Sequence, residues 1–104
     1  MKHFISFFAL FSICLLQASA QNTGTLTGSV KDKLTQEALI GVTIRIDGAN
    51  LGGQTDVEGN FRIAGIRPGS YNIEASYLGY VTQTKYNVVI TTGNANQLNF
   101  ELEP

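Results

Sequence analysis

Apolar and polar residues alternate along much of this chain with a period of two, the spacing typical of β-strands. The clearest run is residues 40–47, IGVTIRID, in which Ile40, Val42, Ile44 and Ile46 are separated by polar residues or glycine. Successive side chains of a strand point to opposite faces of its sheet. This run therefore predicts a strand with one buried face and one solvated face.

The same alternation recurs in other segments, and polar or glycine-containing turns separate them. Further strands are predicted at residues 25–32, 60–63, 71–77, 86–90 and 98–102, and another strand ends at Gln54 and Thr55. Turns are predicted at residues 48–50 and 92–94, and Pro68-Gly69 suits the centre of a type II turn. Short strands that recur every eight to twelve residues or so predict a single all-β sandwich or barrel.

The inward positions of these strands should form one hydrophobic core. The predicted core contains Ile40, Val42, Ile44, Ile46, Phe61, Ile63, Tyr71, Ile73, Val88, Leu98 and Phe100. Each large apolar side chain contributes about 1.5–3 kcal/mol when it is fully buried. Because the chain is short, this core has little stability to spare.

The first twenty residues are predicted to be a secretory signal peptide. Lys2 and His3 form a short basic start, an apolar stretch runs from Phe4 to Leu16, and Ala18-Ser19-Ala20 is a small-residue cleavage site. The apolar stretch is too short for a typical membrane span. We therefore expect export through the Sec pathway, residues 21–24 as a short leader, and one domain at residues 25–103.

Removal of the signal peptide narrows the chemistry that the chain can perform. The only cysteine, the only histidine and one lysine lie in residues 1–20, so six basic and eight acidic side chains remain, with a net charge of −2. This inventory excludes cysteine nucleophiles, Ser-His-Asp triads and zinc sites built on histidine or cysteine. It also lacks the basic face of a nucleic-acid-binding protein. The sequence predicts no catalytic residues and no cofactor.

One acidic, glycine-rich segment is a candidate calcium site. In residues 53–60, GQTDVEGN, the side chains of Asp56, Glu58 and Asn60 could offer oxygen ligands. The EF-hand spacing is absent, because Gly59 directly follows Glu58. The favoured interpretation is a hairpin turn in which Asp56 accepts hydrogen bonds from nearby backbone N–H groups and Gly59 has a positive φ.

Tyrosines gather in the C-terminal half of the chain. Tyr77, Tyr80 and Tyr86 are candidates for a ligand or partner surface, for example one that binds carbohydrate. The alternative is that these tyrosines pack on the sheet and reach water with their hydroxyl groups. Tyr80 follows Gly79, so it is expected at a rim of the fold.

Four motifs appear in a fixed order along the chain. They are GSVKD at 28–32, QEALIGVTIRIDG at 36–48, TDVEGNFRI at 55–63 and PGSYNIEASYLGY at 68–80. Together they resemble the carboxypeptidase regulatory-like domain, although Ala38 stands where that family often has proline. The resemblance implies a seven-stranded Greek-key β-sandwich of the transthyretin (prealbumin-like) type, with no catalytic activity.

Behind a signal peptide, these motifs look most like the N-terminal extension of TonB-dependent outer-membrane receptors of Gram-negative bacteria. The resemblance implies a non-catalytic accessory domain in the periplasm or at the outer membrane. Its partners would be proteins, such as the TonB system or a receptor plug and barrel. No plug or barrel follows Pro104, so a truncated receptor is expected, or a free-standing secreted binding module for carbohydrate or another ligand.

Overall fold

The computed structural model describes residues 22–104, and the predicted signal peptide lies outside the described residues. The regular elements in this part are β1 (Gly24–Asp32), β2 (Thr43–Asp47), β3 (Leu51–Gln54), β4 (Asn60–Ile66), β5 (Gly69–Ser76), β6 (Gln83–Ile90), β7 (Gly93–Gln97) and β8 (Phe100–Leu102). The prediction of an all-β chain is confirmed. Within these residues, no helix is long and apolar enough to cross a membrane.

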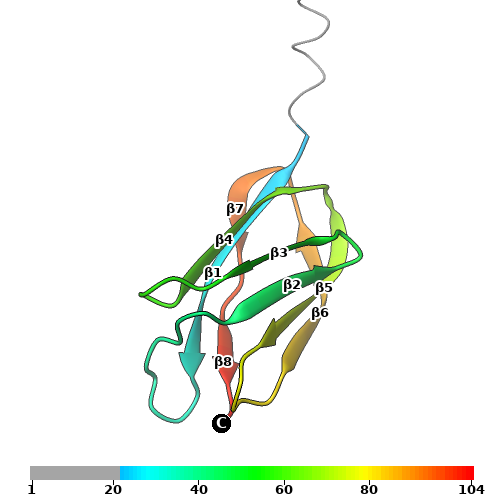
Figure 1. The fold of residues 1–104 in the computed structure, drawn as a ribbon. Helices are drawn as coiled ribbons and strands as arrows, with labels where there is room; N and C mark the ends of the chain where they lie inside the picture. Colours follow the sequence, from blue (N-terminus) through cyan, green and yellow to red (C-terminus); the bar gives the residue numbers. More distant parts are fainter. Residues whose placement is uncertain (1–21) are drawn as a thin grey trace, which may run out of the picture.

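The strands form two sheets that pack face to face as a sandwich (Figure 1). One sheet has the order β3-β2-β5-β6, and all its neighbours are antiparallel. In the other sheet β1 lies between β4 on one side and β7 and β8 on the other. The pairing of β1 with β4 is antiparallel, whereas its pairings with β7 and β8 are parallel. The predicted sandwich is therefore confirmed.

The number of strands is eight rather than the predicted seven, because β7 was interpreted as part of a turn. Its sequence, GNANQ, has no apolar alternation. Hydrogen bonds hold it instead: the Asn96 Nδ2 donates to the Thr25 carbonyl at 3.2 Å and to the Thr91 carbonyl at 2.8 Å. Because the Asn96 amide rather than apolar side chains holds β7 in place, the hydrophobic pattern of the sequence does not predict this strand.

The core between the sheets contains fourteen buried apolar residues. The buried residues that the sequence predicted are Val42, Ile44, Ile46, Phe61, Ile63, Ile73 and Phe100, and the ones it missed are Leu26, Val30, Leu39, Ile66, Ala75, Ile90 and Leu102. Three other predicted core residues, Tyr71, Val88 and Leu98, are partly buried against this cluster. Ten of the eleven predicted core residues are therefore buried or partly buried, but the prediction missed half of the fully buried ones.

Ile40 was predicted to be buried, and this was wrong, since it is 52% exposed. The next residue, Gly41, has φ +79° and interrupts the alternation, so Leu39 points into the core in its place. The buried hydroxyl of Thr55 accepts a hydrogen bond from the Val42 N–H at 2.9 Å and donates one to the Leu39 carbonyl at 2.6 Å. Thr55 thereby fixes the irregular segment before β2.

The start of the first strand and the type of one turn also differ from the predictions. Gly24, the last residue of the predicted leader, is buried and begins β1. Gly69 begins β5 and its φ is not positive, so Pro68-Gly69 is not a type II turn. The positive φ in this region belongs to Gly65, near the end of β4.

Candidate functional site

The turn between β3 and β4 is built around one aspartate. The Asp56 Oδ1 accepts hydrogen bonds from the N–H of Glu58 at 2.9 Å and of Asn60 at 3.0 Å. The Asp56 N–H donates to the Asn60 carbonyl at 2.8 Å, and Gly59 has φ +79°. These contacts are those of the predicted hairpin turn, and they use one carboxylate oxygen for the backbone.

The same turn holds the candidate calcium ligands. Glu58 and Asn60 are exposed, as is Asp56. Across residues 22–104, no three His, Cys, Asp or Glu side chains converge as a metal-binding group. The turn therefore accounts for Asp56 by backbone chemistry, and the prediction that it binds no calcium stays a prediction.

Two of the three candidate tyrosines lie together in the loop between β5 and β6. The ring centroids of Tyr77 and Tyr80 are 5.7 Å apart, with the rings tilted by 37°. The Tyr80 hydroxyl donates a hydrogen bond of 2.7 Å to the Asp32 Oδ2, at the end of β1. Tyr86 is separate from this pair: it lies within β6 and is 70% exposed.

Asp32 connects the tyrosine loop to the loop between β1 and β2. Its Oδ1 accepts hydrogen bonds from the N–H of Leu34 at 2.7 Å and of Thr35 at 3.0 Å, while its Oδ2 faces Tyr80. The Tyr80 hydroxyl and these N–H groups stabilise the carboxylate, so the pKa of Asp32 is held below its ordinary value. The same hydrogen bond raises the pKa of Tyr80.

A second set of contacts fixes the tyrosine loop to the C-terminal segment. The Val81 N–H donates to the Glu103 carbonyl at 2.7 Å. The Glu103 carboxylate forms an exposed ion pair with the Lys33 Nζ at 2.8 Å. The loop is thus attached to both the β1–β2 loop and the segment after β8. This arrangement limits the number of conformations that the loop can adopt.

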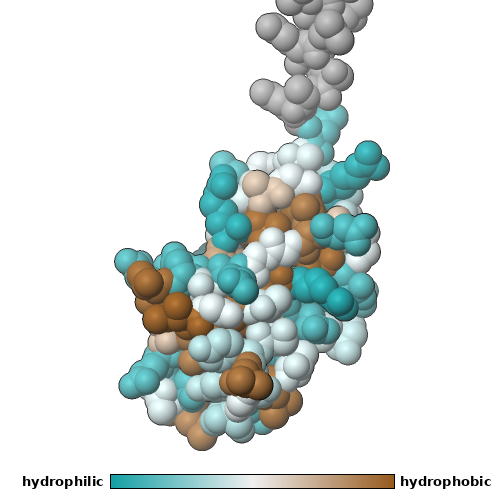
Figure 2. Space-filling model, in the orientation of Figure 1, coloured by the Kyte–Doolittle hydropathy of each residue, from teal (hydrophilic) through white to brown (hydrophobic). Residues whose placement is uncertain are grey.

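The fixed loop presents apolar side chains to solvent. Leu78 is 96% exposed, Val81 61% and Tyr77 37%, and we call these three residues the tyrosine-loop patch. Ile40, on the neighbouring β1–β2 loop, is also exposed, and it precedes Gly41, where an added Cβ would lie 4.0 Å from the Tyr77 ring. Figure 2 shows apolar side chains on the surface at this end of the sandwich. Apolar residues that form a contiguous exposed patch can mark a site of protein interaction.

Sequence reasoning found Tyr77 and Tyr80 but missed Asp32, which fixes their loop. A local signal was present, because an aspartate at a strand end, followed by Thr35 three residues later, suits an Asx turn. The contact of Asp32 with Tyr80 joins residues 48 positions apart, and no local pattern reports such a contact.

Comparison with known proteins gives a family. The sequence model described as the carboxypeptidase regulatory-like domain matches residues 25–103. Carboxypeptidase D of Rattus norvegicus is 38% identical over 79 residues, which cover 76% of this chain and 6% of the relative. Carboxypeptidase D of Homo sapiens is 36% identical over 77 residues, which cover 74% of this chain and 6% of the relative. The chain thus spans a small part of the curated relatives that it matches.

Solved structures share the fold at low sequence identity. A chain of a type II cohesin–X-dockerin complex from Acetivibrio cellulolyticus has a TM-score of 0.64 and 23% identity, covering 74% of this chain and 52% of that one. A candidate carbohydrate-binding protein from Bacteroides uniformis has a TM-score of 0.57 and 17% identity, covering 75% and 40%. The C-terminal domain of a shaft pilin from Lactobacillus rhamnosus GG has a TM-score of 0.53 and 16% identity, covering 81% and 99%.

Proposed function

This chain belongs to the carboxypeptidase regulatory-like domain family, and on that premise we propose that it is a non-catalytic domain that works by binding a protein partner. The family domain is a β-sandwich and not a catalytic domain. The described residues supply no cysteine and no histidine. We therefore propose that the domain functions through a binding surface rather than through an active site.

The observation that carries this proposal is the tyrosine-loop patch. Leu78 and Val81 are large apolar residues with most of their surface in water, on a loop that Asp32 and Glu103 hold in place. A surface that is already ordered loses less conformational entropy when a partner binds. Covering the exposed parts of these side chains contributes about 25 cal/mol per Å² of apolar area removed from water.

More specifically, we propose that the chain is a periplasmic accessory domain of a TonB-dependent outer-membrane receptor. The support comes from the sequence: the predicted signal peptide at residues 1–20 and the four-motif series that resembles the family from residue 28 to residue 80. The protein would be exported through the Sec pathway. Its partners would be the periplasmic part of the energy-coupling protein or the receptor's own plug and barrel.

A pull-down tests this proposal. The mature chain is immobilised and offered the purified periplasmic region of the energy-coupling protein from the same bacterium. We expect retention by the unmodified chain, loss of retention with Leu78→Asp, and no change with Val89→Asp, which places the same charge at another exposed apolar residue, on β6. Retention that is lost only with Val89→Asp, or absent throughout, would contradict the proposal.

A second candidate function is carbohydrate binding, and Tyr77 favours it. Its ring is partly exposed and lies beside the Tyr80 ring at 5.7 Å, and aromatic rings can stack on sugar faces. The candidate carbohydrate-binding protein from Bacteroides uniformis shares the fold. Retention on a glycan array that Tyr77→Ala abolishes, without a protein partner, would favour this second function.

A further inference from the structure

We propose that the free edge of β3 binds an extended acidic segment of a partner polypeptide, which pairs with β3 as an added strand. β3 pairs with β2 on one side and with no strand of the described chain on the other. The unpaired N–H and C=O groups of an edge strand can pair with another extended backbone. This surface is distinct from the tyrosine-loop patch.

The edge of β6 carries features that hinder such pairing. Lys85 points inward: its Nζ donates to the Asn99 carbonyl at 2.6 Å and lies 5.3 Å from the centre of the Phe100 ring. Asn87 has φ +55°, and the register with β5 shifts beside it. Inward charges and bulges are the devices by which natural edge strands avoid added partners.

The other edges are hindered as well. On β4, the backbone N–H and C=O of Asn60 are already used by Asp56, Arg62 is charged and exposed, and Gly65 has φ +75°. On the far side of β1, the edge is split between two separate strands, β7 and β8, so it is not continuous. Neither edge offers a continuous unoccupied strand.

The edge of β3 is also short, with four residues, but it is continuous and carries no inward charge and no bulge. Its sequence, Leu51-Gly52-Gly53-Gln54, has no charge and no proline, and each of these residues has a negative φ. Strands of a native protein are expected to carry some protection at a free edge. Apart from its shortness, β3 has none of the protective features found on the other three edges, and this distinguishes it from them.

Neighbouring hydrogen bonds show which groups of β3 face outward. The Thr55 N–H donates to the Val42 carbonyl, and the Thr55 carbonyl accepts from the Gly41 N–H, so Thr55 faces β2. Alternate residues of an antiparallel strand face the same side. Gly53 therefore also faces β2, and the N–H and C=O groups of Gly52 and Gln54 face outward, where the described residues provide no partner. An added strand could form four hydrogen bonds with them.

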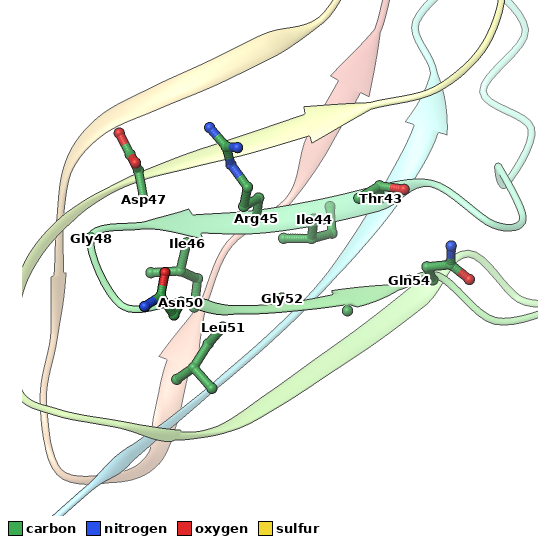
Figure 3. A pocket seen from close by; sticks show the side chains of 11 residues that line it. Thr43, Ile44, Arg45, Ile46, Asp47, Gly48, Asn50, Leu51, Gly52 and Gln54 are labelled. Carbon is green, nitrogen blue, oxygen red and sulfur yellow. The ribbon is translucent and has the colours of Figure 1, made fainter.

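A hollow of about 500 Å³ lies along the β2–β3 hairpin and gives room for a side chain of the added strand (Figure 3). Arg45 is the cross-strand neighbour of Gly52, and Figure 3 shows the Arg45 side chain pointing away from Ile44 and Ile46. Because Gly52 has no side chain, nothing stands between Arg45 and a residue on the added strand. Glu74 is the cross-strand neighbour of Arg45 on β5, but the two side chains do not form an ion pair, and among residues 22–104 the only ion pair joins Lys33 and Glu103.

Arg45 and Gly52 together indicate the chemistry of the partner. An acidic side chain placed opposite Gly52 would meet the Arg45 guanidinium, which binds carboxylates well. Pairing of β3 with β3 of a second copy is disfavoured, since that strand carries Gly52 and Gly53 at its centre and supplies no side chain for the hollow. The occupant is therefore an acidic segment of a different polypeptide.

A titration with synthetic peptides tests this proposal. The probe is a seven-residue peptide of alternating threonine and valine with a central glutamate, and the readout is the backbone amide spectrum of the mature chain. We expect the amides of Gly52 and Gln54 to shift on titration and to exchange more slowly with solvent. The same peptide with a central lysine should bind about two- to fivefold more weakly, the scale of an exposed ion pair.

Two controls separate strand addition from other binding. A peptide N-methylated on alternate residues cannot donate to the β3 edge and should cause no shift. Gln54→Pro removes one outward donor from an edge position that tolerates proline, and should weaken binding about two- to tenfold. Arg45→Glu should reverse the preference, so that the lysine peptide binds more tightly. Shifts confined to β6, equal binding of the N-methylated peptide, or a dimer formed through β3 would each overturn the proposal.

Discussion

Two turns of this domain use the same chemistry and differ in what they hold. Asp32 and Asp56 each end or follow a strand, and each accepts two backbone hydrogen bonds at one carboxylate oxygen. Leu34 lies two residues after Asp32, and Val57 directly follows Asp56. Both of these apolar side chains are 77% exposed. In local sequence terms the two turns are nearly equivalent.

The difference lies in the second carboxylate oxygen. At Asp32 it accepts the Tyr80 hydroxyl, so the β1–β2 loop and the tyrosine loop hold each other. The hydrogen bonds of Asp56 all stay within residues 56–60. One turn therefore organises a neighbouring surface, whereas the other only reverses the chain. The long-range contact of Asp32 with Tyr80 connects this turn to the proposed contact surface.

The largest loss of stability is expected for Gly59→Ala, in the Asp56 turn. A Cβ at Gly59 would lie 2.9 Å from both the Val30 carbonyl oxygen and the Ala38 Cβ, at φ +79°. Strain and overpacking together should cost about 2–5 kcal/mol. Gly79→Ala is the matched control in the tyrosine loop, because its φ is +89° with open space around it, and it should cost only about 1–2 kcal/mol. Equal losses in urea unfolding would contradict this account.

A smaller effect is expected at Thr55, which joins the Asp56 turn to the segment before β2. Thr55→Val removes the hydroxyl between the Val42 N–H and the Leu39 carbonyl and leaves both groups buried. The free energy of unfolding should fall by about 1–3 kcal/mol. Thr55→Ser keeps the hydroxyl and should lose less, and a serine variant as unstable as the valine variant would argue against this role.

The long-range contact of Asp32 predicts a pH effect. In the folded state the pKa of Asp32 lies below its ordinary value of 3.8, so its contribution to stability is present above that pH. This contribution is lost as the pH falls through the folded pKa. Tyr80→Phe removes the first cause of the shift, so the pKa of Asp32 should rise toward 3.8 while the Tyr77 contact is kept.

Carboxyl carbon chemical shifts, followed from pH 7 to pH 2, measure this change. The two proteins should differ most in stability at neutral pH and should converge in acid. An Asp32 titration that is identical in the two proteins would show that Tyr80 does not stabilise the carboxylate.

The smallest effect is expected from calcium at the Asp56 turn. An ion that binds only the folded state would raise the melting temperature, and we expect excess calcium to leave it unchanged. The Asp56 Oδ1 already accepts two backbone hydrogen bonds. A rise of several degrees that Asp56→Asn abolishes would restore the calcium site.

The same contrast explains what the sequence could predict. β2 was predicted because its buried residues alternate, and the Asp56 turn was predicted because its partners lie two and four positions away. β7 was missed because Asn96 holds it by hydrogen bonds, and Ile40 was misplaced because the positive φ of Gly41 leaves no mark on the hydrophobic pattern. The Asp32–Tyr80 contact joins the end of β1 in one sheet to the β5–β6 loop of the other, across 48 positions of sequence, so no local pattern predicts it.

The central claim, that the tyrosine-loop patch and not the Asp56 turn binds the partner, is tested most directly by one affinity comparison. Calorimetry would measure binding of the energy-coupling protein's periplasmic region to the mature chain, to Leu78→Asp and to Val57→Asp, both of which place a charge at an exposed apolar position. We expect Leu78→Asp to weaken binding by at least about tenfold, or about 1.4 kcal/mol, and Val57→Asp to leave it unchanged. Equal affinity of the Leu78→Asp variant and the unmodified chain would contradict the claim.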